Sequence, residues 1–133
     1  MEAPRAVTLE TRHLRAALEF AVAMAREGQK IRPPLKYPTG LKQFLKQPRL
    51  TAAALPAVRR AIEADDTFRT RLSAGALPEL VDEIGRLWLA RPDGWETEAL
   101  HLAAESDAAA EAADLSAELK KSEKRREAAE QAV

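Results

Sequence analysis

Cysteine is absent from this 133-residue chain, which excludes disulfides, thiolate metal sites and cysteine nucleophiles and agrees with a cytoplasmic protein. Histidine occurs only twice, at His13 and His101, so nitrogen ligands for a metal are scarce. No apolar run reaches the ~18 residues that a membrane span requires. Glu2, Glu10 and Glu19 interrupt the stretch in which a signal peptide would be apolar. The sequence therefore predicts a protein that is neither exported nor associated with a membrane.

The charges of the chain sum to zero but are unevenly distributed. Residues 26–60 contain nine Lys or Arg and one acid, Glu27, which gives a net charge of +8. Residues 61–118 contain four Arg and fourteen Asp or Glu, which gives −10. Two interpretations remain open: the two blocks attract each other as faces of one molecule, or each block recruits its own partner.

Apolar residues recur with helical spacing, and Val, Ile and Thr are too few for a sheet, so we expect an all-α fold. The pattern predicts a compact bundle of about six helices, with a first helix capped at Thr8 or Thr11 and ending at Gly28. Three short helices follow, near residues 39–47, 55–64 and 66–75, the last of them capped by Asp65 or Asp66. A fifth begins with Pro78 at its first position and ends before Pro92.

A long, protruding C-terminal helix completes the predicted fold. Asp93 and Glu96 have the spacing of a capping box, and no Pro or Gly follows before Val133. Beyond residue 105 the large apolar residues are Leu115 and Leu119, too few for a strong coiled coil. We therefore divide the chain into a helical domain, 1–105, and a charged, Ala-rich helix, 106–133, that starts a coiled coil or linker. Because the helix has no stop signal, we expect the natural chain to continue.

The segment 29–38 is the candidate binding surface. Three prolines make it an extended connector rather than a helix, and it is rich in basic residues. Basic side chains there and in the next helix have the chemistry to contact phosphates, with one tyrosine to stack on a base. The predicted nucleic-acid-binding residues are Lys30, Arg32, Lys36, Tyr37, Lys42, Lys46 and Arg49. The alternative is that these cations are merely solvated or face the acidic block.

The remaining polar residues indicate no chemistry. His101 has Glu98 and Glu105 at helical spacing, but one histidine between acids is far more often a surface residue than a metal ligand. No nucleophile, base and acid arrangement or phosphate loop can be assembled, so we expect neither catalysis nor a cofactor. Trp88 and Trp95 flank a turn, where we expect them to fix a buried helix junction, with the indole N–H bonded to a turn carbonyl.

Three short strings occur in an order that resembles a known family. They are LKQFLK at 41–46, EADDTFR at 63–69 and LWLARPDGW at 87–95. Together they resemble the N-terminal region of actinobacterial YacP-like NYN-domain proteins, a family described as RNA-binding. The resemblance covers about residues 10–105. It implies a helical domain that leads into a charged coiled coil and then a C-terminal NYN domain, a nuclease fold whose acidic residues hold a divalent metal.

The strands and aspartates of an NYN domain are absent here, so the resemblance carries nuclease activity onto no residue of this chain. It implies a non-catalytic accessory domain of an RNA-processing protein. We expect this domain to dock single-stranded or structured RNA through the basic connector. The alternative is a module for protein interaction or self-association that uses the acidic surface and the long C-terminal helix.

Overall fold

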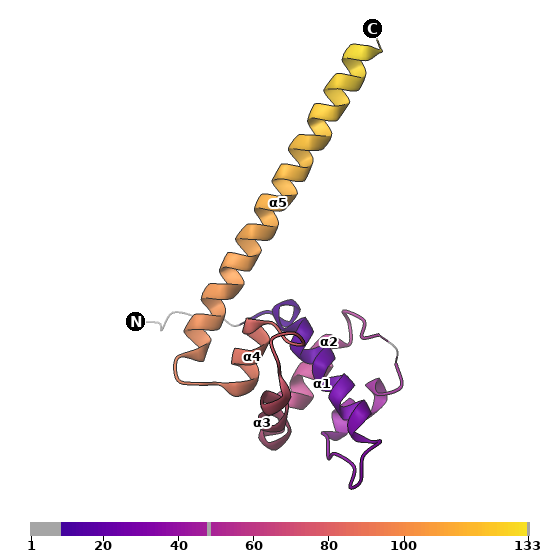
Figure 1. Cartoon of the computed structure of the whole chain (residues 1–133), viewed down its shortest axis with the longest axis vertical. Coiled ribbons are helices and arrows are strands. Elements are labelled where there is room, and N and C mark those ends of the chain that lie inside the picture. The colour runs from indigo at the N-terminus through magenta and orange to yellow at the C-terminus, as the bar shows by residue number, and fades with distance from the viewer. Residues whose placement is uncertain (1–8, 48, 133) are drawn as a thin grey trace, which may run out of the picture. The chain divides into compact units, whose positions relative to one another are not determined.

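The computed structural model describes residues 9–47 and 49–132, and all regular structure within them is helical (Figure 1). The chain divides into two compact units, residues 1–100 and 101–133. The elements are two 3-10 helices and five α-helices: η1 Thr11–Leu14, α1 Arg15–Gly28, η2 Thr39–Phe44, α2 Leu55–Glu63, α3 Asp66–Gly75, α4 Glu83–Ala90 and α5 Trp95–Gln131. The predicted all-α fold with a long C-terminal helix is confirmed.

The first predicted helix is divided into η1 and α1; its predicted end at Gly28 is confirmed and its predicted start is revised. Thr11 is the first residue of η1, so the N-cap is Glu10, whose backbone N–H lies 3.2 Å from Nδ1 of His13. Thr8, the other predicted cap, lies outside the described residues. At the other end, Gly28 is the last helical residue and is buried. A Cβ on Gly28 would lie 2.5 Å from Cβ of Leu35, so this glycine permits close packing rather than a left-handed cap.

The helices that begin at strong local signals form where the sequence predicts them. Helix α2 has Pro56 in its first turn, where its missing N–H costs nothing. Asp65 caps α3 by accepting a hydrogen bond of 3.0 Å from the N–H of Phe68. The segment 39–47 forms a 3-10 helix, η2, that ends at Phe44, short of the predicted end at Gln47. Pro48, the predicted stop signal, lies outside the described residues.

Helix α4 begins five residues later than Pro78 predicts. Residues 77–81 form turns instead, with N–H groups of Leu80 and Val81 donating to the carbonyl of Leu77. Leu80 is therefore exposed. The N-cap is Asp82, which accepts from the N–H of Gly85 at 3.0 Å, so this carboxylate caps the helix rather than decorating its polar side.

The connection from α4 to α5 contains two residues with positive φ, Arg91 at 53° and Gly94 at 78°. Arg91 is the left-handed C-cap of α4, and its N–H donates to the carbonyl of Leu87. Because Gly94 is not helical, α5 begins at Trp95. The predicted capping box is therefore wrong, since it requires residue 94 to be the first helical residue after Asp93.

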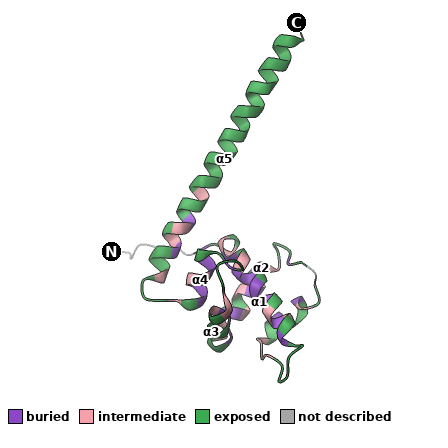
Figure 2. Cartoon of the chain, in the orientation of Figure 1, coloured by how far each residue is buried: buried purple, intermediate pink, exposed green. Residues whose placement is uncertain are grey.

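The core of the first unit is formed by side chains from all of its helices (Figure 2). Helix α3 packs against α4, α1 packs against α2 and α4, and η2 packs against α2. The largest side chains that are fully buried are Trp88, Phe68, Leu14, Leu18, Leu41, Ile62, Leu72, Leu89, Val58 and Val81. No helix among the described residues is both long and apolar enough to cross a membrane.

Candidate nucleic-acid interface

The basic connector, residues 29–38, loops back onto the end of α1. The N–H of Leu35 donates to the carbonyl of Gly28 at 2.9 Å. The amide of Gln29 donates to the carbonyls of Ala25 at 2.9 Å and Leu35 at 3.0 Å, which closes the base of the loop. The segment contains no helix, as predicted, although these bonds make it a closed loop rather than a simple extended strand. The loop therefore holds residues 30–34 at the surface, and all five are exposed.

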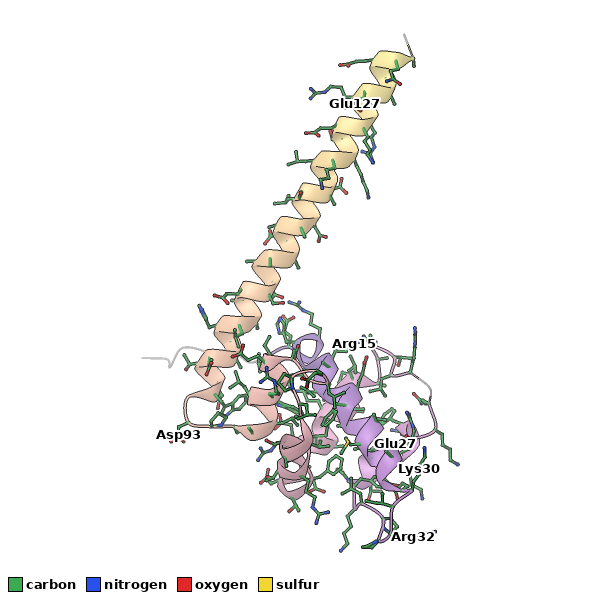
Figure 3. The ribbon with its side chains drawn as sticks, viewed as in Figure 1. Arg15, Glu27, Lys30, Arg32, Asp93 and Glu127 are labelled. Carbon is green, nitrogen blue, oxygen red and sulfur yellow. The ribbon has the colours of Figure 1, made fainter. Side chains whose placement is uncertain are left out.

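The cations of this loop point into solvent. Figure 3 shows Arg32 at the outer edge of the connector, with Lys30 beside Glu27 near the end of α1. Nζ of Lys30 lies 3.1 Å from Oε1 of Glu27, an exposed pair that contributes little to stability. Arg32 and Lys36 have no hydrogen-bond or ion-pair partner among the described residues.

Two further lysines lie on η2 and in the turn directly after it. Leu41 and Phe44 are buried and anchor this helix, while Lys42 and Lys46 are exposed. The two lysines border a shallow hollow of about 400 Å³ that is also lined by Thr39, Gly40 and Gln43. Neither lysine has a protein partner among the described residues. This surface can thus accept an anion without first breaking an ion pair.

Lys36 and Tyr37 occupy a different setting from the η2 lysines. Lys36 lines a hollow of about 170 Å³ together with Asp65, Thr67, Phe68 and Arg71. Lys36 is exposed, whereas Tyr37 is only partly so, which leaves less of the tyrosine ring available for stacking than the sequence predicts. Within the described residues no carboxylate lies within ion-pair distance of Lys36, although Asp65 belongs to the acidic block.

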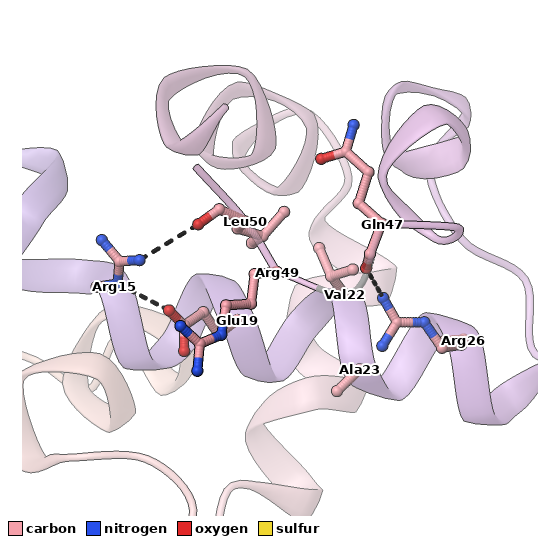
Figure 4. Close-up of a pocket in the computed structure, with 8 residues that line it drawn as sticks. All are labelled: Arg15, Glu19, Val22, Ala23, Arg26, Gln47, Arg49 and Leu50. Atoms are coloured by element: carbon pink, nitrogen blue, oxygen red, sulfur yellow. Dashed lines mark hydrogen bonds and ion pairs between the residues drawn. The ribbon is translucent and has the colours of Figure 1, made fainter. Parts of the chain in front are cut away.

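Arg49 lies in a hollow that the sequence does not predict (Figure 4). This hollow has a volume of about 390 Å³ and is lined by residues of α1 together with Gln47, Arg49 and Leu50. Arg15 borders it and bonds both Glu19, at 2.8 Å, and the carbonyl of Leu50, at 3.2 Å. Arg49 is exposed and has no protein partner among the described residues. The hollow is therefore cationic, with Glu19 its one lining carboxylate and already paired.

Arginines and lysines differ in what they do in the first unit. Six arginines donate to main-chain carbonyls, and these are Arg15, Arg26, Arg59, Arg69, Arg86 and Arg91. Arg26 holds the carbonyls of Leu45 and Gln47, each at 2.7 Å, and thereby fixes the chain after η2 to α1. In the described part of the chain, Lys30 alone of the lysines has a protein partner. Guanidinium groups build the framework, and ammonium groups are left for solvent or a ligand.

The tryptophan junction is a structural cluster. Trp88 is fully buried, and its indole N–H donates to Oε1 of Glu63 at 2.8 Å rather than to a turn carbonyl as predicted. Arg91 donates to the other oxygen of Glu63, also at 2.8 Å. Its guanidinium carbon lies 5.8 Å from the ring centre of Trp88 and 5.2 Å from that of Trp95, within reach of cation–π attraction. Trp95 is only partly buried, so Trp88 is the anchor of the junction.

Glu63 carries an altered pKa in this cluster. Burial alone would raise the pKa of Glu63, but hydrogen bonds from Arg91 and Trp88, with the positive charges of Arg91 and Arg59, outweigh burial and lower it. The carboxylate is therefore ionised at neutral pH, and each of its oxygens accepts a hydrogen bond. Through these two hydrogen bonds, Glu63 joins the end of α2 to α4 and to the turn after it.

No metal site accompanies these features in the described ranges, where no three His, Cys, Asp or Glu side chains gather closely enough to hold an ion. Nε2 of His101 lies 3.0 Å from Oε1 of Glu105, one turn further along α5. No protein-family model matches the chain, and neither a curated protein nor a solved structure matches it significantly. The candidate interface thus depends on its own geometry and charge.

Proposed function

We propose that the first unit is a non-catalytic domain that docks RNA through its basic surface, within a larger, cytoplasmic RNA-processing protein of the NYN type. The NYN assignment depends on the resemblance of the three strings at 41–46, 63–69 and 87–95. One observation carries the RNA assignment. Five exposed cations between residues 32 and 49 have no protein partner within the part of the chain that the structure describes, and these are Arg32, Lys36, Lys42, Lys46 and Arg49.

Two alternatives for these cations were that they are merely solvated or that they pair with the acidic block, and the structure bears on the second. Such pairing would bring carboxylates within 4 Å of the lysines, and Lys36, Lys42 and Lys46 have none among the described residues. Exposed cations without an internal partner lower the free energy of a nearby polyanion and release its counterions. The described ion pairs therefore favour an external anion over an internal one.

The arrangement favours binding with little sequence preference. Lysines contact phosphates as point charges, and phosphate contacts carry no base information. Tyr37 is the only tyrosine and is partly covered, so it offers a small stacking surface. We expect the affinity to depend mainly on salt and on the length of the single strand.

Fluorescence anisotropy with a labelled single-stranded RNA tests the proposal. Five phosphate contacts predict that the logarithm of the affinity falls against the logarithm of salt with a slope of about −3.5, since each contact contributes ~0.7. Replacing Lys36, Lys42 and Lys46 with Ala removes three of these contacts, so the slope should flatten to about −1.5 and binding should weaken for all sequences alike.

The matched control replaces Lys120, Lys121 and Lys124 with Ala, because these lysines are equally exposed but lie on α5. The control should bind RNA as the natural chain does. Failure of the natural chain to bind at low salt would overturn RNA docking. Equal weakening by both triple variants would overturn the assignment of the site to the connector and η2.

A further inference from the structure

The charges of α5 are separated along its length. Residues 105–118 contain five acids and no Lys or Arg, whereas residues 119–126 contain five Lys or Arg and one acid, Glu123. The helix dipole favours acids in the first turn and bases in the last turn only. The two halves of this pattern meet near residue 119, in the middle of the unit 101–133, so the dipole does not explain them.

Within a single helix this pattern is unfavourable. Side chains four residues apart lie on the same face, where like charges repel. Asp114 and Glu118 have this spacing, as do Lys120 and Lys124. Opposite charges at helical spacing, such as Glu118 with Lys121 and Lys120 with Glu123, offset only part of this repulsion. A surface of opposite charge outside the helix would relieve the repulsion.

An apolar strip crosses the point where the two halves meet. Leu115 and Leu119 lie one turn apart and remain 62% and 65% exposed. Small residues continue the same face at helical spacing, with Ala108 and Ala112 before the leucines and Ser122 after them. Figure 2 shows this part of α5 as exposed throughout. The strip is short, but it lies at the junction of the two halves of α5, so a partner that covers the strip can contact both acidic and basic side chains.

We infer that a second copy of the chain covers this strip, with the two α5 helices antiparallel. Parallel helices would place the acidic half of each copy beside the acidic half of the other. Antiparallel helices place residues 105–118 of one copy beside residues 119–126 of its partner, where opposite charges attract. The charge pattern therefore selects both the occupant and its direction.

The positions of the leucines set the register of this pair. Opposing Leu115 of one copy to Leu119 of the other brings Ala112 opposite Ser122. Glu111 of one copy then flanks the seam beside Arg125 of the other, on both sides of the axis. The two copies of Glu118 meet near the axis, where they repel each other. Because only two leucines per helix are buried, the pairing is weak and weakens further as salt screens the charges.

Sedimentation velocity of the full chain tests the pairing. We expect association at low salt and monomers at high salt. Glu111→Arg and Arg125→Glu should each lower the association constant about tenfold, because each creates two like-charge contacts per pair. Combining both substitutions in one chain exchanges the charges across the seam and should restore association. This rescue also shows that the single variants remain folded.

Two further variants sharpen the register. Lys124→Glu changes the net charge as much as Arg125→Glu does but lies on the face away from the seam, so it should alter association much less. Glu118→Gln should strengthen association, because it removes the repulsion at the axis. Equal effects of Lys124→Glu and Arg125→Glu would show that net charge, rather than this seam, controls association.

The direction is tested by disulfide trapping, since the chain contains no cysteine of its own. The two substitutions, Ala112→Cys and Ser122→Cys, leave the charge of the helix unchanged. In the antiparallel pair, a mixture of the two variants should form a mixed disulfide, and neither variant should cross-link alone. In a parallel pair each variant would cross-link alone, because each cysteine would face the same position of the other copy. No mixed disulfide would form there, because positions 112 and 122 would lie about 15 Å apart along the seam. Cross-linking of single variants, or a monomer at every concentration and salt, would overturn the inference.

Discussion

The two units of the chain differ in what stabilises them. In residues 9–100, large apolar side chains are fully buried, and guanidinium groups join distant segments, as when Arg59 donates to the carbonyl of Leu9 at 2.7 Å. In the second unit every described side chain from Ala108 onward is exposed, Leu115 and Leu119 among them. The first unit is stabilised by its own tertiary contacts. The helix from residue 108 onward is stabilised only by its own backbone hydrogen bonds and by any partner that packs against it.

The comparison also separates the roles of the two basic residue types. Arginine's planar group can donate to several carbonyls at once, and in the first unit it does so at helix junctions. Lysines in both units point into solvent. The net charge of +8 in residues 26–60 therefore overstates the available binding charge, because Arg26 and Arg59 serve the fold.

The largest expected effect breaks the first unit. Trp88→Ala removes a fully buried ring and its hydrogen bond to Glu63, and it should lower the free energy of unfolding by about 3–5 kcal/mol. Urea denaturation, followed by the fluorescence of the remaining tryptophan, measures the loss. The matched variant is Trp95→Ala, which should cost only about 1–2 kcal/mol because Trp95 is partly exposed. Equal losses would mean that both rings anchor the junction.

A smaller effect depends on pH. Because the pKa of Glu63 is lower in the folded chain, its ionised form stabilises the fold above the ordinary pKa of 4.5, and this stability is lost as pH falls through the folded pKa. Glu63→Gln should therefore cost about 1 kcal/mol at pH 7, after allowance for the partial exposure of the pair. The difference from the natural chain should narrow below pH 4.5.

Denaturation of both proteins at several pH values checks this expectation. Glu79→Gln is the control, since the Glu79 side chain is exposed, lies outside the helices and has no partner among the described residues. The control should match the natural chain at every pH. A cost for Glu63→Gln that stays constant with pH would show that the loss comes from altered packing rather than from the charge.

The part of the fold that follows local signals could be predicted from the sequence. Pro56 and Asp65 mark the starts of α2 and α3 through their own backbone and side-chain chemistry. The end of α1 at Gly28 was also predictable, but the packing of Leu35 against this glycine, seven residues further along the chain, was not. Pro78 was misread because Asp82 offers a better cap and fixes the start of α4 after the turn.

The candidate site was predictable to the same extent. Exposure of Lys42 and Lys46 follows from their helical spacing opposite Leu41 and Phe44. The hollow that contains Arg49 was not predictable, because it forms only where Gln47, Arg49 and Leu50 lie against α1 in the fold. Likewise, no local pattern reveals that Arg26 bonds carbonyls some twenty residues away. Charge counts along a sequence cannot distinguish a framework guanidinium from a free one.

The smallest expected effect tests the contrast between the two units directly. Ending the chain after Ala110 removes Leu115, Leu119 and the basic half of α5. The removed side chains are exposed, so the thermal midpoint of the remaining domain, measured by tryptophan fluorescence, should change by no more than about 3 °C. The same truncation should abolish self-association. A fall in the midpoint well beyond that range, with Leu115→Ala and Leu119→Ala in the full chain producing the same fall, would mean that these leucines stabilise the first unit and that the two units are not independent.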